Sequence, residues 1–159
     1  MTNHMKFTTI GVLAVGIALA GCSGNREAET KLVEITGNDE MKFDVTSFEV
    51  KAGEKVTVTL TNIGELAKEA MAHNWALLEK GTDAAKLVAA GADHPEIDYI
   101  PTDQAAHVLA KTKMLGPFDS DSITFAAPTD PGPYEYICSF PDHYTNGMKG
   151  VMTVTPNAK

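Results

Sequence analysis

A succession of short segments that alternate apolar and polar residues constrains this fold more than any other feature of the sequence. In the stretch KVTVTLT, Val56, Val58 and Leu60 alternate with lysine and threonine, which places the apolar side chains on one face of a strand. Turn-forming stretches such as GND, AGEK and DPGP separate these segments. The pattern predicts an all-β antiparallel sandwich or barrel. The eight predicted strands span residues 31–36, 41–50, 55–61, 74–79, 107–115, 121–127, 133–139 and 150–155.

One stretch departs from the strand pattern. Residues 82–93 (TDAAKLVAAGAD) are rich in alanine, begin with Thr82 or Asp83 as an N-cap and reach Gly91 as a stop signal. They predict one short helix inserted between strands. With 159 residues, the chain is long enough for one domain with a hydrophobic core and too short for two of ordinary size.

The first 21 residues differ from the rest of the chain and predict a lipoprotein signal peptide. Lys6 precedes an apolar run from Phe7 to Ala20 that is too short to span a bilayer. The run ends in LAGC, which resembles the bacterial lipobox, so we expect Cys22 to be lipidated and to anchor the mature chain. The alternative is a secreted protein cleaved after Ala20 or Gly21, with a free Cys22.

The next residues predict a flexible membrane tether over 22–31, because SGNREAETK is polar and poor in apolar residues. Ser23, directly after the cysteine, is typical of an outer-membrane address. We therefore expect the protein on the periplasmic side of a bacterial membrane, with its folded domain over residues 32–159.

The number of cysteines and the net charge limit the classes of function that this chain can have. The chain has two cysteines, and lipidation of Cys22 would leave Cys138 as a lone thiol in an oxidising compartment. Such a thiol is protected either by a bound metal or by burial in the core. The formal net charge of -8 argues against nucleic acid as a partner.

Cys138 opens the pattern C-x4-H-x4-M, in which His143 and Met148 follow on a loop between two predicted strands. A further histidine, His73, leads directly into the apolar strand at residues 74–79. Two imidazoles, a thiolate and a thioether form the ligand set that suits an electron-transfer copper site, in which a weak axial methionine lies off the His2Cys plane.

The residues alone leave three alternatives open. Structural zinc would give Met148 no role. A nucleophile formed by Cys138 and His143 would need a third group to orient the base, and Asp142 is the polar candidate nearby. The last alternative is that these loop residues bind nothing, which leaves the lone thiol unexplained.

Five segments together resemble azurin, a blue copper protein of the cupredoxin class. They follow the azurin order from Leu32 to Val154 and read GNDEMKFD, LAKEAMAHNWALL, AKTKMLG, DSITF and CSFPDHYTNGMKGVMTV. The ligand-loop spacing is similar to that of auracyanin, a membrane-attached relative. The resemblance implies an eight-stranded Greek-key cupredoxin sandwich or barrel with one short inserted helix, and one type 1 copper per chain.

The resemblance also implies a role for each site residue. The copper ligands would be His73, Cys138 and His143 in the equatorial plane, Met148 as the long axial ligand, and the backbone carbonyl of Ala72 as a weak axial contact on the opposite side. Azurins have glycine where this chain has Ala72, so the axial distance is expected to differ.

Two further residues belong to the implied surroundings of the copper. The backbone amides of Asn74 and Phe140 would donate hydrogen bonds to the Cys138 sulfur and tune the reduction potential. A β-turn cap is the alternative role for Asn74.

Three departures from azurin limit what the resemblance carries over. The chain lacks the cysteines for the usual disulfide, and Asn62 and Lys111 stand where the family has histidines. Asp142 replaces the glycine before the second histidine ligand. Aspartate tolerates a left-handed backbone, and its carboxylate beside His143 should favour Cu(II) and lower the potential.

The resemblance implies an electron carrier and not an enzyme, and the LAGC sequence adds the expectation that it is anchored to a membrane. Electrons would pass through an exposed edge of His143, beside an apolar patch of Met71, Ala72, Pro141 and Tyr144. The expected partners of the monomeric carrier are redox proteins such as cytochromes or respiratory oxidoreductases, bound transiently. A periplasmic copper-binding or delivery protein is the alternative, while a copper enzyme of the nitrite-reductase kind would need a second cupredoxin domain.

Overall fold

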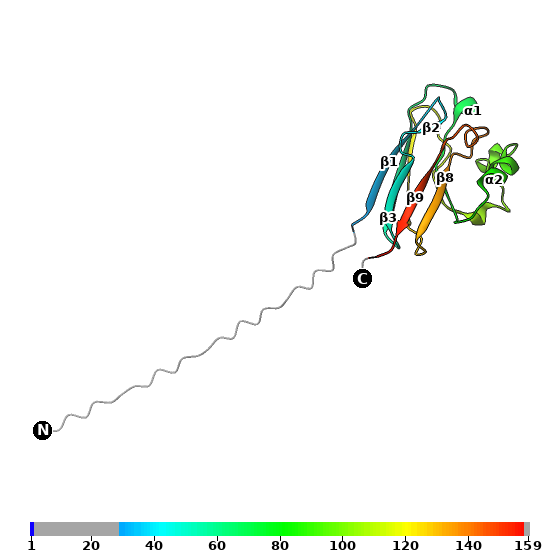
Figure 1. Cartoon of the computed structure of the whole chain (residues 1–159). Helices are drawn as coiled ribbons and strands as arrows, with labels where there is room; N and C mark the ends of the chain where they lie inside the picture. The colour runs from blue at the N-terminus through cyan, green and yellow to red at the C-terminus, as the bar shows by residue number, and fades with distance from the viewer. Residues whose placement is uncertain (2–28, 158–159) are drawn as a thin grey trace.

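Two β-sheets face each other in a computed structural model that describes Met1 and residues 29–157 (Figure 1). One sheet has four strands in the order β2-β1-β4-β7, and the other has five in the order β3-β9-β8-β5-β6. The strands are β1 (Lys31–Asn38), β2 (Lys42–Phe43), β3 (Ser47–Lys51), β4 (Lys55–Asn62), β5 (Ala76–Leu78), β6 (Val108–Lys111), β7 (Ser120–Ala126), β8 (Gly132–Ile137) and β9 (Lys149–Thr155).

The predicted all-β sandwich is confirmed, with a difference in strand count. The segment 41–50, predicted as one strand, forms β2 and β3, which lie in different sheets. Asp44 lies between them, and its carboxylate accepts hydrogen bonds from the Thr36 amide at 2.6 Å and the Val45 amide at 2.9 Å. These bonds let the chain leave the edge of β1 and cross to the other sheet. The sheets are also mixed, because β1 pairs with β4 and β3 with β9 in parallel.

The core lies between the two sheets, as the alternating pattern predicts. Val56, Val58 and Leu60 of β4 are fully buried, and burial of each such side chain contributes about 1.5–3 kcal/mol. The Trp75 ring is also fully buried, with its centroid 5.6 Å from that of Tyr136. This packing lies directly beneath the segment that carries His73 and Asn74.

The inserted helix is α2 (Ala84–Gly91), and its Ala84 and Leu87 belong to a second core cluster with Ala76, Leu78, Ile100 and Ile137. Asp83 is its N-cap, since the carboxylate accepts a hydrogen bond from the Lys86 amide at 3.1 Å. Three shorter helical turns were not predicted: α1 (Lys68–Met71), η1 (Pro95–Ile97) and η2 (Ala105–His107). Within the described part of the chain, no helix is both long enough and apolar enough to cross a membrane.

The two ends of the sandwich differ. Strand β1 begins near the end of β9, and α1 lies at the opposite end of the sandwich (Figure 1). The proposed lipidation site Cys22, the rest of the tether up to residue 28 and the predicted signal peptide apart from Met1 lie outside the described residues.

Gly91→Ala should destabilise the protein by about 1–3 kcal/mol, the usual cost of overpacking. A Cβ at Gly91 would lie 1.9 Å from the backbone oxygen of Tyr99, which cannot move as a side chain can. Urea denaturation measures the change. Ala90→Ser, on the exposed side of the same helix, is the control and should change stability by less than about 0.5 kcal/mol. Equal unfolding midpoints for Gly91→Ala and the wild type would contradict this account.

Candidate metal centre

Backbone pairing fixes the four proposed ligands in space. His73 lies between α1 and β5, and its amide and carbonyl both bond to Leu115, at 3.1 and 2.8 Å. Cys138 directly follows β8, and its amide donates to the carbonyl of Met148 at 3.1 Å. The Met148 amide in turn donates to the His143 carbonyl at 2.9 Å, which closes the loop between β8 and β9.

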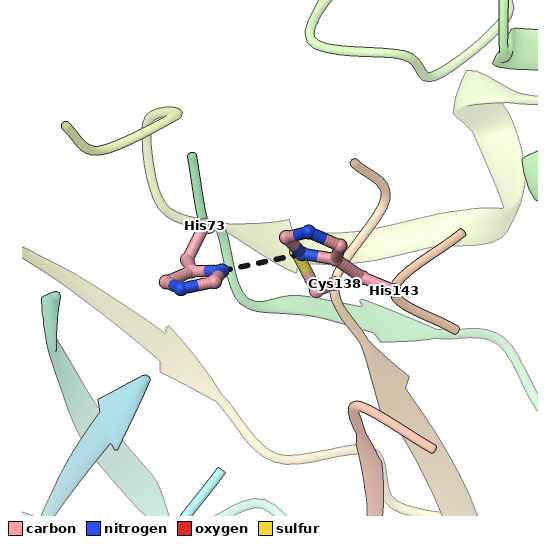
Figure 2. A group of neighbouring side chains, drawn as sticks. All are labelled: His73, Cys138 and His143. Carbon is pink, nitrogen blue, oxygen red and sulfur yellow. Dashed lines mark hydrogen bonds between the residues drawn. The ribbon is translucent and has the colours of Figure 1, made fainter. Parts of the chain in front are cut away.

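Three ligand atoms converge in the interior. Nδ1 of His73 lies 3.2 Å from Nδ1 of His143, which lies 3.4 Å from Sγ of Cys138. Figure 2 shows the two rings and the sulfur directed toward one another. All three side chains are at most 1% exposed. A metal bound to nitrogen at about 2.0 Å would hold two ligand nitrogens roughly 3.2 Å apart, so the spacing fits a single ion.

Burial sets the protonation of these groups. It lowers the pKa of His143 to about 4, with a smaller contribution from His73. It also lowers the pKa of His73, although the carbonyl of Asn38 and the charge of Asp39 act in the opposite direction. Both imidazoles are therefore neutral at pH 7, which is the form that binds metal.

Burial raises the pKa of the Cys138 thiol to about 12. Hydrogen bonds from the backbone amides of Asn74 and Phe140 act against this by favouring the thiolate. These amides lie where the resemblance to azurin places them. A bound metal cation deprotonates a coordinating thiol outright, so the donor set of neutral imidazoles and a buried sulfur fits a soft metal ion.

Asn74 links the two ligand loops through Ser139. The Ser139 amide donates to Oδ1 of Asn74 and Nδ2 of Asn74 donates to Oγ of Ser139, both at 2.8 Å. The Ser139 hydroxyl donates onward to the carbonyl of Asp98 at 2.6 Å. Sequence reasoning missed Ser139 and Asp98, because the only available signal was the position of Ser139 next to Cys138.

The two residues expected at the axial positions, Met148 and Ala72, are both buried. Met148 is fully buried, and its terminal methyl lies beside Gly37 of β1. Ala72 is 1% exposed and has extended backbone angles, φ -75° and ψ 154°, immediately before His73.

Asp142 adopts the left-handed conformation, with φ of 68°. Its carbonyl accepts hydrogen bonds from the amide and the side chain of Asn146, at 3.0 and 2.9 Å, and from the Thr145 hydroxyl at 2.8 Å. The expectation that aspartate tolerates this conformation is met. These bonds fold the loop back so that His143 faces inward.

The residues of the expected docking patch are only partly open. Ala72 is buried, and Met71, Pro141 and Tyr144 are half-buried. Tyr144 packs against the second core cluster, and the ammonium of Lys149 lies 4.4 Å from the centre of its ring. His143 itself is only 1% exposed, so the exposed edge expected from the resemblance is not found, because the surrounding side chains cover the ring.

The comparisons with known proteins agree with this site. The family model of copper-binding proteins of the plastocyanin/azurin family matches residues 29–155. The chain belongs to the plastocyanin/azurin family. The resemblance to azurin is thereby confirmed, and copper is the metal that this family binds.

Two known relatives align with most of this chain. Auracyanin-B of Chloroflexus aurantiacus is 35% identical over 151 residues, which span 94% of this chain and 63% of auracyanin-B. Azurin-1 of Alcaligenes xylosoxydans xylosoxydans is 40% identical over 129 residues, with 76% of this chain and 94% of azurin-1 covered.

Solved structures of auracyanins have the same fold. The crystal structure of dithionite-reduced auracyanin from Roseiflexus castenholzii superposes with a TM-score of 0.70 at 39% identity, over 79% of this chain and 98% of that one. Auracyanin A of Chloroflexus aurantiacus gives a TM-score of 0.71 at 32% identity, over 80% and 100%. The predicted cupredoxin fold is thereby confirmed.

Asn74→Ala should reduce the free energy of unfolding by about 1–3 kcal/mol, because it leaves the buried Ser139 amide without its partner. Thermal and urea unfolding of the metal-free protein measure the loss. Asn157→Ala removes an exposed bond to the Ala52 carbonyl and serves as the control, with an expected change below about 0.5 kcal/mol. If the two variants were equally stable, Asn74 would not hold the ligand loops together.

Proposed function

We propose that this protein is a type 1 blue copper electron-transfer protein that carries single electrons between redox partners at a bacterial membrane surface. The observation that supports this most is the buried convergence of two imidazole nitrogens and one thiol, at 3.2 and 3.4 Å, with a buried methionine beside them. This donor set suits both Cu(I) and Cu(II).

Each residue has a role in the proposed site. His73, Cys138 and His143 would hold the copper through two imidazole nitrogens and a thiolate, and the buried Met148 thioether and the carbonyl of Ala72 would be the weaker contacts. Copper supplies a one-electron couple when bound. The protein holds the ligands through paired backbone and excludes water by burial, so the ligands move little between oxidation states.

We propose the apolar surface around Met71 and Pro141 as the docking patch for redox proteins such as cytochromes or respiratory oxidoreductases. Transient redox encounters use small interfaces, so a modest patch is sufficient. The carrier would act as a monomer.

The LAGC sequence supports lipidation at Cys22 and a location on the periplasmic side of the membrane. Strand β1, which follows the proposed tether, begins at the end of the sandwich opposite α1 (Figure 1). His73 follows α1 closely. An anchor at Cys22 would therefore leave the metal end free to face a partner.

Copper delivery is the second candidate, and the burial of the site argues against it. A delivery protein exchanges its metal, which favours ligands that a partner can reach. Here His73, Cys138 and His143 are at most 1% exposed. Slow copper exchange to a chelator would agree with a carrier and rapid exchange with a delivery protein.

A copper titration tests the proposed function. A fragment from Ser23 onward should bind one equivalent of Cu(II) and give an intense blue thiolate-to-copper band with narrow parallel hyperfine splitting in EPR. Cys138→Ser should abolish both signals, while His107→Ala, at an exposed histidine bonded to Glu79, should retain both. A pale spectrum with wide splitting from the wild-type fragment would sink the electron-carrier proposal.

Asp142→Asn should raise the reduction potential, because it removes a negative charge next to His143 while asparagine still tolerates the left-handed backbone. A charge about 4 Å away that acts through water contributes about 1 kcal/mol, or roughly 40 mV for a one-electron couple. Protein-film voltammetry measures the shift. Glu49→Gln, at an exposed position on β3, should leave the potential unchanged. A lower potential in Asp142→Asn would refute the electrostatic argument.

A further inference from the structure

Gly37 closes the metal site from the side of β1. The GND sequence that contains it indicates only a turn, but Gly37 is still part of β1, where it pairs with Phe43 of β2 and Asn62 of β4. Its carbonyl accepts the Ile63 amide at 2.8 Å. Its φ lies outside the left-handed region, so backbone freedom does not explain why this residue is glycine.

Space explains it instead. A Cβ at Gly37 would lie 2.8 Å from Cε of Met148 and 3.0 Å from Cδ2 of His73. Carbon atoms pack best at about 3.5–4.0 Å, so both contacts are too close. The volume that a side chain would occupy is filled by two of the proposed copper ligands.

Of these two ligands, Met148 is the one that would move. The His73 backbone is bonded on both sides to Leu115, and its ring packs against that of His143 with centroids 4.9 Å apart. Met148 has three rotatable bonds and meets Gly37 with its terminal methyl. Because Met148 is fully buried, a displaced thioether would stay within the buried ligand site and could not turn out to solvent.

We propose that Gly37 is a positioning residue that sets where the Met148 sulfur lies relative to the plane of His73, Cys138 and His143. The inference rests on the type 1 copper site proposed above. The distance of the weak axial ligand tunes such a site, so the missing side chain on β1 selects the axial geometry from outside the ligand loop.

Gly37→Ala tests the proposal through two readouts. In the metal-free protein, the ε-methyl NMR resonance of Met148 should shift, because the methyl loses its place against the Gly37 Cα. With one equivalent of Cu(II), the ratio of the short-wavelength to the long-wavelength thiolate-to-copper band should change. An unchanged methyl resonance together with an unchanged band ratio would overturn the inference.

Gly116→Ala is the matched control. Gly116 is also crowded and also lies outside the left-handed region, but its added Cβ would meet the Cβ of Lys68 at 3.2 Å and no ligand. It should leave the Met148 resonance and the copper spectrum as in the wild type. A spectral change of equal size in Gly116→Ala would show that general strain, and not the contact with Met148, causes the effect.

A double-variant cycle tests whether Gly37 acts on the site through Met148 or through His73. Leucine at position 148 lacks the terminal methyl that meets Gly37, so Gly37→Ala should add no spectral change in a Met148→Leu background. A change that persists there would assign the effect to His73 and refute the proposal. If Gly37→Ala alone fails to fold, Met148→Leu should restore folding by removing the clash, and failure to restore it would refute the proposal too.

The outcomes also separate this inference from the proposed function. A wild-type protein without an intense thiolate-to-copper band would remove the copper site, whatever Gly37→Ala does. A blue wild-type protein whose spectrum and Met148 resonance are unaffected by Gly37→Ala would leave the electron carrier intact and remove only the role of Gly37.

Discussion

The pairing of β5 with β8 is the constraint on which the metal site depends. Ala76 pairs with Ile137 and Leu77 with Tyr136 in antiparallel register. The segment before β5 and the segment after β8 therefore lie at the same end of the sheet. This register brings His73 and Cys138 together from positions 65 residues apart. Because side chains alternate between the faces of a strand, a slip of one residue would direct Cys138 away from the histidines. The Asn74–Ser139 bonds reinforce the same juxtaposition just beyond the strands.

Water is excluded from this end of the sheet because the hydrophobic core extends up to the ligands. Trp75, which directly precedes β5, and Tyr136 of β8 pack against each other, with ring centroids 5.6 Å apart. The Phe140 ring lies 4.7 Å from that of His143. The same burial that packs these rings keeps both imidazoles neutral and the thiol protonated. Buried polar groups of this kind cost stability when they lack partners, so the ligands are tolerated there because they face one another, and a shared cation would satisfy all three.

Local sequence patterns predicted what depends on neighbouring residues. Alternation located the strands, and His73 together with the spacing of Cys138, His143 and Met148 favoured a copper site over the alternatives of structural zinc, a nucleophile or no bound group. The division of 41–50 into two strands was missed because it depends on Asp44 bonding to Thr36 across the sheet. Gly37 was missed for the same reason: its importance lies in what occupies the space beside it, and the occupants come from segments distant in sequence. Non-local contacts of this kind leave no periodic trace in the chain.

The insertion that contains α2 contacts the site through two residues with strained backbone angles, Asp98 and Tyr99. Asp98 and Tyr99 are consecutive residues with left-handed φ of 52° and 58°, a conformation that costs on the order of 1–3 kcal/mol for each such residue. The Ser139 hydroxyl donates to the Asp98 carbonyl, and the Lys111 ammonium lies 2.6 Å from the Asp98 carboxylate. The amides of Asp98 and Tyr99 donate to the carbonyls of Pro95 and His94. The ring of Tyr99 then lies edge-on to Phe140, which packs on His143. Contacts with the ligand loop thus help to keep Asp98 and Tyr99 in this conformation. A substitution that removes one of these contacts would alter the packing around His143 without changing a ligand.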